Sequence, residues 1–190
     1  MPAERAYVPS MSPPALLTAD ELLQVRIPDK RVELVKGVLV VREPAGMRHG
    51  RVAMEVAHRL VHHVEACGLG RVYAAETGFT LFRNPDTVRA PDVAFVRSER
   101  LLDPEPTGFA DLAPDLVVEV LSPDDRPGEV LAKVADWLSA GTRLVWVVDP
   151  ERRLARVYRK DGTETLLAAD EALDGEDVVP GFSCGLSAVF

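Results

Sequence analysis

Two carboxylates of this chain stand inside apolar segments. Glu119 lies within the apolar run 116–121, and Asp92 opens the apolar run 93–96. An unpaired buried carboxylate is costly, so each acid requires a cation, a hydrogen-bond network or a metal ion. Taken singly, each is explained by a salt bridge or a cap at a strand end. Taken together on neighbouring strands, they predict a site for one hard divalent cation, which prefers oxygen ligands.

Lys133 is the third candidate for chemistry, because it lies on the helix predicted to follow the strand of Glu119. An ammonium group beside a metal site can orient the attacking water or stabilise charge that develops on a phosphorus centre. The alternative is an ordinary solvated lysine on a helix surface.

Other polar and aromatic candidates are weaker. His58 and His62 have a spacing that suits a metal pair, but the sequence offers no H-E-x-x-H motif or third ligand, which favours a polar helix face. Trp137 and Trp146 are predicted to be core residues rather than a platform for stacked bases. No G-x-G-x-x-G or Walker lysine motif is present, so nucleotide-cofactor chemistry is not supported.

Length and composition predict a folded protein of about one domain, with 190 residues of which 47% are hydrophobic. No apolar run approaches the roughly 20 residues of a membrane span, and the N-terminal residues lack the apolar core of a signal peptide. Cys67 and Cys184 lie too far apart in sequence for a C-x-x-C motif, which fits a reducing cytoplasm.

The charge distribution limits the nucleic-acid hypotheses. A net charge of −8 argues against a general nucleic-acid coat, but it is compatible with a nuclease whose basic surface is local. The stretch 26–51 is locally basic and forms either a solvated face or a phosphate-facing surface. Its cations are Arg26, Lys30, Arg31, Lys36, Arg42, Arg48 and Arg51. We predict nucleic-acid contacts for Arg48 and Arg51, and for His49, whose alternative role is to cap a helix.

Hydrophobic periodicity predicts a mixed α/β domain with helices covering a central sheet. We expect a proline-rich flexible tail over 1–15 and a single domain over 16–190. A helix is predicted at 18–25, where Thr18 and Glu21 can form a capping box, and another at 49–66, followed by a glycine stop at Gly68. A third is predicted at 128–139, and the last segment of the chain is expected to be irregular. Strands are predicted at 32–35, 38–41, 72–82, 88–96, 116–121, 144–148, 154–158 and 163–167.

An ordered set of motifs resembles the Uma2 family, once called DUF820, which has the PD-(D/E)xK, restriction-endonuclease-like fold. The resemblance covers about 17–190. Its pieces are V-E-L-V-K-G at 32–37, His49, R-A-P-D-V at 89–93, V-E-V-L-S-P at 118–123, Lys133, and the run G-T-R-L-V-W-V-V-D-P at 141–150.

The resemblance implies a role for each matching residue. Asp92 and Glu119 would be the metal-binding acids, and Glu33 the upstream acid that completes the site, as a further metal ligand or by orienting another ligand. Arg89, in the R-A-P-D-V piece, is separately predicted to contact nucleic acid. The implied cofactor is Mg²⁺ or Mn²⁺. The family pattern of the nuclease fold places a lysine two residues after the second acid, where this chain has Leu121. Lys133 is expected to supply the displaced basic group.

Two classes of function follow. The first is a metal-dependent endonuclease that hydrolyses DNA phosphodiesters by attack of an activated water, expected to act as a homodimer because a duplex has two strands. The second is a nucleic-acid-binding or regulatory protein that keeps the fold without efficient catalysis, which Leu121 and the acidic net charge favour. A hydrolase of another phosphoester is a third possibility.

Overall fold

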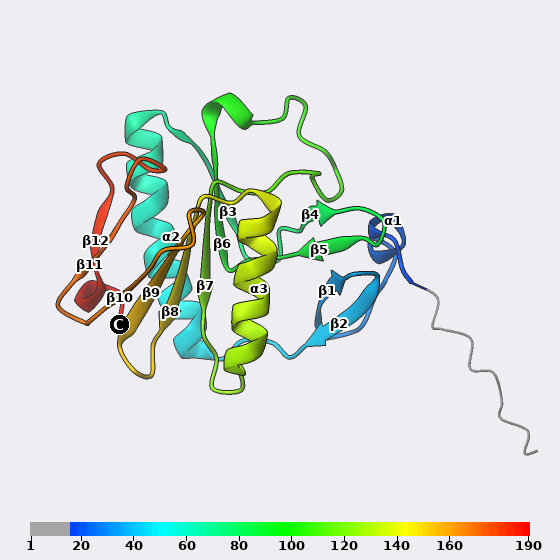
Figure 1. Ribbon diagram of the computed structural model, residues 1–190, viewed down its shortest axis with the longest axis horizontal. Helices are drawn as coiled ribbons and strands as arrows, with labels where there is room; N and C mark the ends of the chain where they lie inside the picture. The colour runs from blue at the N-terminus through cyan, green and yellow to red at the C-terminus, as the bar shows by residue number, and fades with distance from the viewer. Residues whose placement is uncertain (1–15) are drawn as a thin grey trace, which may run out of the picture.

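The computed structural model describes residues 16–190, so the predicted tail over 1–15 lies outside the described residues. Two sheets and three helices make up the main architecture (Figure 1). The helices are α1 (Ala19–Leu22), α2 (Met47–Cys67) and α3 (Pro127–Ala140), with short 3₁₀ turns at Ser98–Arg100 and Leu186–Ala188.

The larger sheet has six strands in the order β10-β9-β8-β7-β6-β3. Only β7 and β8 run parallel, and the remaining neighbours are antiparallel, so the sheet is mixed as predicted. Its strands are β3 (Gly70–Ala74), β6 (Val93–Arg97), β7 (Leu116–Val120), β8 (Leu144–Asp149), β9 (Leu154–Arg159) and β10 (Glu164–Leu167).

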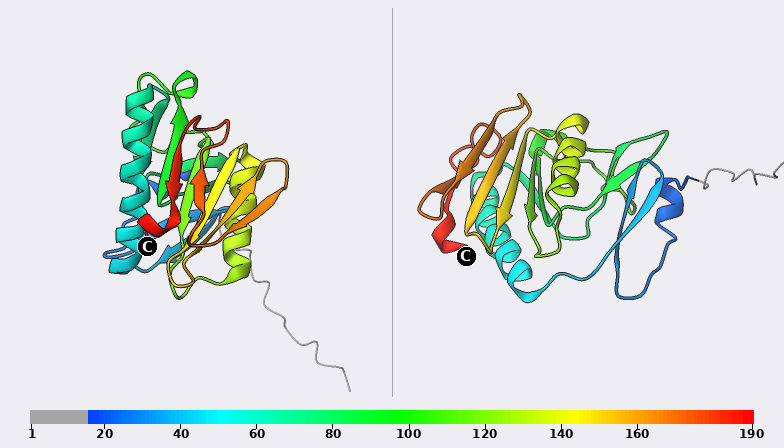
Figure 2. Two further views of the ribbon diagram at one scale, coloured as in Figure 1. Left: turned by 90° about the vertical axis from the view of Figure 1, so that its left-hand side faces the viewer. Right: turned by 60° about the horizontal axis from the view of Figure 1, so that its bottom comes forward.

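Helices α2 and α3 cover opposite faces of this sheet (Figure 2). Apolar residues of α2 recur every four positions and pack with Leu116, Val118 and Val120, one face of β7. The other face of the sheet packs against Trp137 of α3. Helix α2 ends at Gly68, which adopts the left-handed conformation (φ 63°) that a helix stop requires.

The smaller sheet has four strands in the order β2-β1-β5-β4 and lies beside α1 (Figure 1). It contains β1 (Arg31–Val35), β2 (Val38–Arg42), β4 (Phe79–Phe82) and β5 (Thr87–Arg89). Helix α1 begins with the predicted capping box, in which Thr18 and Glu21 satisfy each other's backbone N–H groups.

Two predicted strands are wrong, because each is divided between the two sheets. The run 72–82 breaks at a turn where Glu76 has φ 68°, and separates into β3 and β4. The run 88–96 breaks before β6, where Pro91 lacks the N–H that a continuous ladder needs, and separates into β5 and β6.

The C-terminal segment is also more regular than predicted. It forms β11 (Ala172–Asp174) paired with β12 (Ser183–Gly185), and Leu173, Leu186 and Val189 are fully buried against the α2 side of the core. No helix of the described residues 16–190 is long and apolar enough to cross a membrane.

Candidate active site

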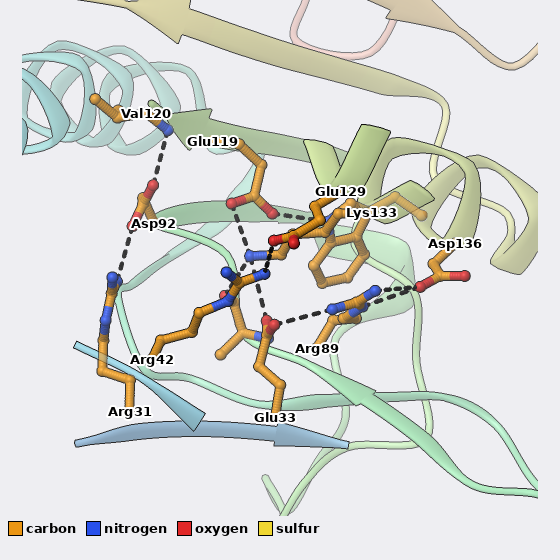
Figure 3. A network of polar contacts seen from close by, with 12 residues as sticks. Arg31, Glu33, Arg42, Arg89, Asp92, Glu119, Val120, Glu129, Lys133 and Asp136 are labelled. Atoms are coloured by element: carbon orange, nitrogen blue, oxygen red, sulfur yellow. Dashed lines mark hydrogen bonds and ion pairs between the residues drawn. The ribbon is translucent and has the colours of Figure 1, made fainter. Parts of the chain in front are cut away.

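Strand β7 directs Glu119 toward α3, because alternate side chains of a strand face opposite sides of a sheet. Burial leaves the Glu119 residue 7% exposed. Two residues of α3, four positions apart and therefore on one helix face, bind its carboxylate, and Figure 3 labels Lys133, one of the two. Lys133 Nζ donates to Oε2 at 2.9 Å, and Trp137 Nε1 donates to Oε1 at 2.8 Å.

Asp92 lies just before β6, where the chain leaves the smaller sheet and enters the larger one. Its Oδ2 accepts a hydrogen bond of 2.7 Å from the Val120 N–H, which ties it to the residue after Glu119. His49 Nε2 of α2 lies 3.1 Å from the same oxygen, and Arg31 Nη1 lies 3.6 Å from Oδ1. The first turn of α2 and the β1 strand therefore both contact this carboxylate.

Glu33 reaches the same place from β1 of the smaller sheet (Figure 3). Its carboxylate accepts hydrogen bonds from Arg89 Nη1 at 3.0 Å and from the Ala90 N–H at 2.9 Å. Lys133 Nζ lies 3.2 Å from Glu33 Oε1, so the ammonium bridges Glu33 and Glu119. The site is thus assembled at the junction of the two sheets.

Burial, with a smaller contribution from the neighbouring carboxylates, makes Glu119 the least stable anion of the cluster. Burial raises the pKa of Glu119 to about 7; Lys133 opposes this shift, while the negative charges of Asp92 and Glu33 add to it. Burial acts against ionisation of Glu33 too, but Lys133 and Arg89 outweigh it and hold the pKa of Glu33 below its usual value.

The neighbours of Lys133 and Asp92 keep both groups charged. Burial disfavours the ammonium, but Glu119 and Glu33 outweigh that effect and raise the pKa of Lys133. Burial likewise disfavours the Asp92 carboxylate, and contacts with His49 and the Val120 N–H more than compensate, so the pKa of Asp92 lies below its usual value.

A cavity of about 220 Å³ opens onto this cluster and is lined by Glu33, Asp92, Glu119 and Lys133. Within residues 16–190, no group of three or more His, Cys, Asp or Glu side chains is arranged to hold a metal ion. Asp92 and Glu119 nevertheless suit Mg²⁺, which commonly binds through one or two carboxylates and keeps water or substrate oxygens in its other positions. A cation there would also relieve the unfavourable charge of Glu119.

The structure brings together the four residues predicted to be catalytic, Glu33, Asp92, Glu119 and Lys133, and their roles stay predictions. His49, predicted to contact nucleic acid or cap a helix, is buried against Asp92. Among the described residues, no group of metal-ligating side chains forms around His58 and His62. Both tryptophans are fully buried, as predicted.

The arginines predicted to contact nucleic acid have different surroundings. Arg48 is exposed at the start of α2 and lines a smaller pocket that also contains His49 and Ser122. Arg51 is exposed, and its Nη1 donates to the Val189 carbonyl at 3.3 Å. Arg89 is only 5% exposed and is bound to Glu33 and Asp136, so phosphate contact would require buried ion pairs to break. This placement makes Arg89 a structural partner of the site, and its contact with nucleic acid stays a prediction.

Sequence reasoning missed three contributors to the cluster. Trp137 was assigned only to the core, Asp136 was not considered, and the Ala90 backbone binds both Glu33 and Lys133. The sequence did offer a signal for Trp137 and Asp136, because they lie four and three residues after Lys133 and therefore near it on the same helix face. The role of the Ala90 backbone has no such signal, because it depends on where the chain crosses between sheets.

The segment 181–185 reads G-F-S-C-G and matches the G-x-S-x-G spacing of serine hydrolases. A nucleophile elbow requires its serine at a sharp turn from a strand into a helix. Ser183 instead begins the short strand β12, far along the chain from the carboxylate cluster. His63, the nearest histidine in this region, contacts the Pro180 carbonyl with its Nε2 at 2.9 Å. The segment is therefore part of a small hairpin.

Comparisons with known proteins bear on the family and the fold of the chain. The family model Uma2, described as "Putative restriction endonuclease", matches residues 19–188. A crystal structure described as "a putative nuclease belonging to DUF820 from Anabaena variabilis ATCC 29413" is similar with a TM-score of 0.77 at 23% sequence identity, covering 92% of this chain and 97% of that chain. Among curated proteins, none matches the chain. The structural likeness supports the restriction-endonuclease-like fold.

Proposed function

The chain belongs to the Uma2 family, and from that premise we propose that it is a metal-dependent endonuclease that hydrolyses DNA phosphodiester bonds. The observation that carries the proposal is the convergence of Asp92, Glu119 and Lys133 on one cavity, although they come from three different elements. Two buried carboxylates can hold a divalent ion, and an ammonium group beside them can stabilise the charge that develops during phosphodiester hydrolysis.

Asp92 and Glu119 would hold the ion, which we expect to be Mg²⁺ or Mn²⁺. When bound, such an ion supplies Lewis acidity toward a phosphodiester oxygen and toward the attacking water. The Val120 N–H and His49 keep the Asp92 carboxylate in place. Trp137 does the same for Glu119, so little reorganisation is needed before substrate enters.

Lys133 would orient the attacking water and stabilise the charge that develops on the phosphate oxygens. Its Nζ is held by Glu119, by Glu33 and by the Ala90 carbonyl at 3.2 Å. This geometry accounts for Leu121 at the usual lysine position, because α3 delivers an ammonium group to Glu119 from the adjacent layer. Glu33, held by Arg89, would act by positioning Lys133.

The second candidate is a protein that binds nucleic acid without cutting it. The observation in its favour is that Lys133 is engaged by two carboxylates, which would leave it unavailable to substrate if no ion competes for Glu119. The two candidates differ in whether metal binding is coupled to strand cleavage, so both quantities must be measured on the same variants.

The test is nicking of supercoiled plasmid in Mg²⁺, Mn²⁺ or EDTA, together with calorimetric titration of Mn²⁺. Asp92→Asn should abolish metal binding and nicking, and Lys133→Met should lower nicking by a factor of about 10² or more with metal binding retained. The matched controls are Asp125→Asn, in the same cavity, and the exposed Lys160→Met. Metal-independent nicking, or nicking by Asp92→Asn at the wild-type rate, would overturn the proposal.

We further propose that two copies act together on a duplex, since one site cuts one strand. Sedimentation of the protein with and without duplex DNA tests this, and double-strand cleavage by a strictly monomeric protein would contradict it.

A further inference from the structure

We propose that Glu129 latches Arg42 across the mouth of the active-site cleft, and that Arg42 exchanges this carboxylate for a phosphate when nucleic acid enters. The inference rests on the proposed nuclease function and adds a regulated phosphate contact to it. Arg42 is the last residue of β2, and Glu129 lies in the first turn of α3. Arg42 Nη2 lies 3.0 Å from Glu129 Oε2, and both residues line the catalytic cavity.

Two ion pairs connect the β1–β2 hairpin to α3 (Figure 3). The inner pair joins Glu33 to Lys133, and the outer pair joins Arg42 to Glu129. Glu129 and Lys133 are four residues apart and therefore occupy one face of the helix. The acid is on the hairpin in the inner pair and on the helix in the outer pair. The outer pair therefore joins the hairpin to α3 about one helical turn closer to the start of α3 than the inner pair does.

The inner and outer ion pairs differ in how far their side chains are exposed to solvent. The side chains of Lys133 and Glu33 are 22% and 8% exposed, whereas those of Arg42 and Glu129 are 40% and 44% exposed. Exposed ion pairs contribute little to stability, so the outer pair is weak enough to open. A guanidinium binds phosphate oxygens at least as well as a carboxylate, because its planar N–H groups suit two acceptor oxygens at once.

The partners of the hairpin cations single out Arg42. Lys30 is paired with Glu43 of the same hairpin, and Arg31 faces Asp92 at the floor of the cleft. Of these three cavity-lining cations, only Arg42 is paired with an acid of helix α3. Release of that single contact frees one cation for a phosphate backbone, while Glu129 keeps a second cation, Arg126 Nη1, 3.9 Å from its Oε1.

A double-mutant cycle tests the latch. Anisotropy of a fluorescein-labelled duplex of about 20 base pairs is measured in Ca²⁺ and in EDTA with the wild type, Glu129→Gln, Arg42→Met and the double variant. We expect Glu129→Gln to tighten the Kd about two- to five-fold, as for loss of a competing surface ion pair. Arg42→Met should weaken binding and lower the slope of log Kd against log salt by about one. The double variant should match Arg42→Met, because Glu129 acts through Arg42.

The control is Glu151→Gln, which removes one exposed acid from a neighbouring pocket that shares Leu121 and Ser122 with the cavity. The latch is overturned if Glu129→Gln binds as the wild type does, if it tightens binding equally without Arg42, or if Glu151→Gln has the same effect. A fall of many degrees in Tm for both single variants would show that the Arg42–Glu129 ion pair stabilises the fold, and this result would also overturn the latch. If the wild type and all variants fail to bind duplex or single-stranded DNA, both the proposed function and the latch are wrong. If the protein cleaves DNA but the variants do not show the expected changes in Kd, only the latch is wrong.

Discussion

Replacing Arg89 by methionine removes the cation that joins β1 and β5 of the smaller sheet to helix α3 beside the site. Arg89 Nη1 lies 3.0 Å from Glu33 Oε2, and Nε and Nη2 lie 3.0 and 2.6 Å from Asp136 Oδ2. Methionine keeps the unbranched stem but leaves both acids without this partner. Lys133 still contacts Glu33, whereas Asp136 loses its ion pair.

The magnitude follows from the burial of the guanidinium, whose side chain is 6% exposed. Removal of one partner from a buried ion pair costs about 3–5 kcal/mol, because the remaining charge is left without compensation. For a protein of this size, each kcal/mol lowers Tm by about 2–4 °C, so we expect Tm to fall by about 6–20 °C.

Urea denaturation and thermal unfolding measure this change, and the chain offers a matched control. Arg83 also joins two acids, Asp86 at 3.0 Å and Asp111 at 2.8 Å, but its side chain is 42% exposed. Arg83→Met should therefore cost at most about 1 kcal/mol. A loss below about 1 kcal/mol for Arg89→Met, or equal losses for the two variants, would refute the assignment of Arg89 as a buried structural cation.

Three further predictions concern the site and its support. Trp137→Phe removes the donor to Glu119 and should cost about 1–3 kcal/mol in urea denaturation; an unchanged midpoint contradicts the hydrogen bond. Gly70→Ala should cost about 2 kcal/mol or more, because a Cβ there would lie 2.0 Å from the Val96 carbonyl oxygen, whereas Gly128→Ala meets no atom and should be neutral or slightly stabilising. Glu119, with a pKa of about 7, must lose its proton to bind metal, so Mn²⁺ affinity measured by calorimetry should fall about ten-fold from pH 8 to pH 6. Because the pKa of Glu119 is higher in the folded than in the unfolded chain, Glu119 favours the metal-free fold most at a pH below the ordinary pKa of glutamate. This contribution to the free energy of unfolding is lost as pH rises through 7. A metal affinity that does not change with pH would contradict the raised pKa.

Several features of this protein were determined by the sequence itself, because they depend on residues close together in the chain. The Thr18–Glu21 capping box and the glycine stop at Gly68 were predicted and are present. The apolar run around Glu119 predicted a buried strand, and periodicity placed Lys133 on the following helix. Local hydrogen bonding and side-chain periodicity are sufficient for predictions of this kind.

Sheet membership and side-chain partners were decided only by the tertiary structure. The residues on either side of Pro91 read as one strand, yet long-range pairing places β5 in one sheet and β6 in the other. That crossing brings Glu33 to Lys133 and buries Arg89, which the sequence had placed at a nucleic-acid surface. Pairing between distant strands depends on the packing of the whole chain rather than on local pattern, so the same residues that predict a strand do not say which sheet will contain it.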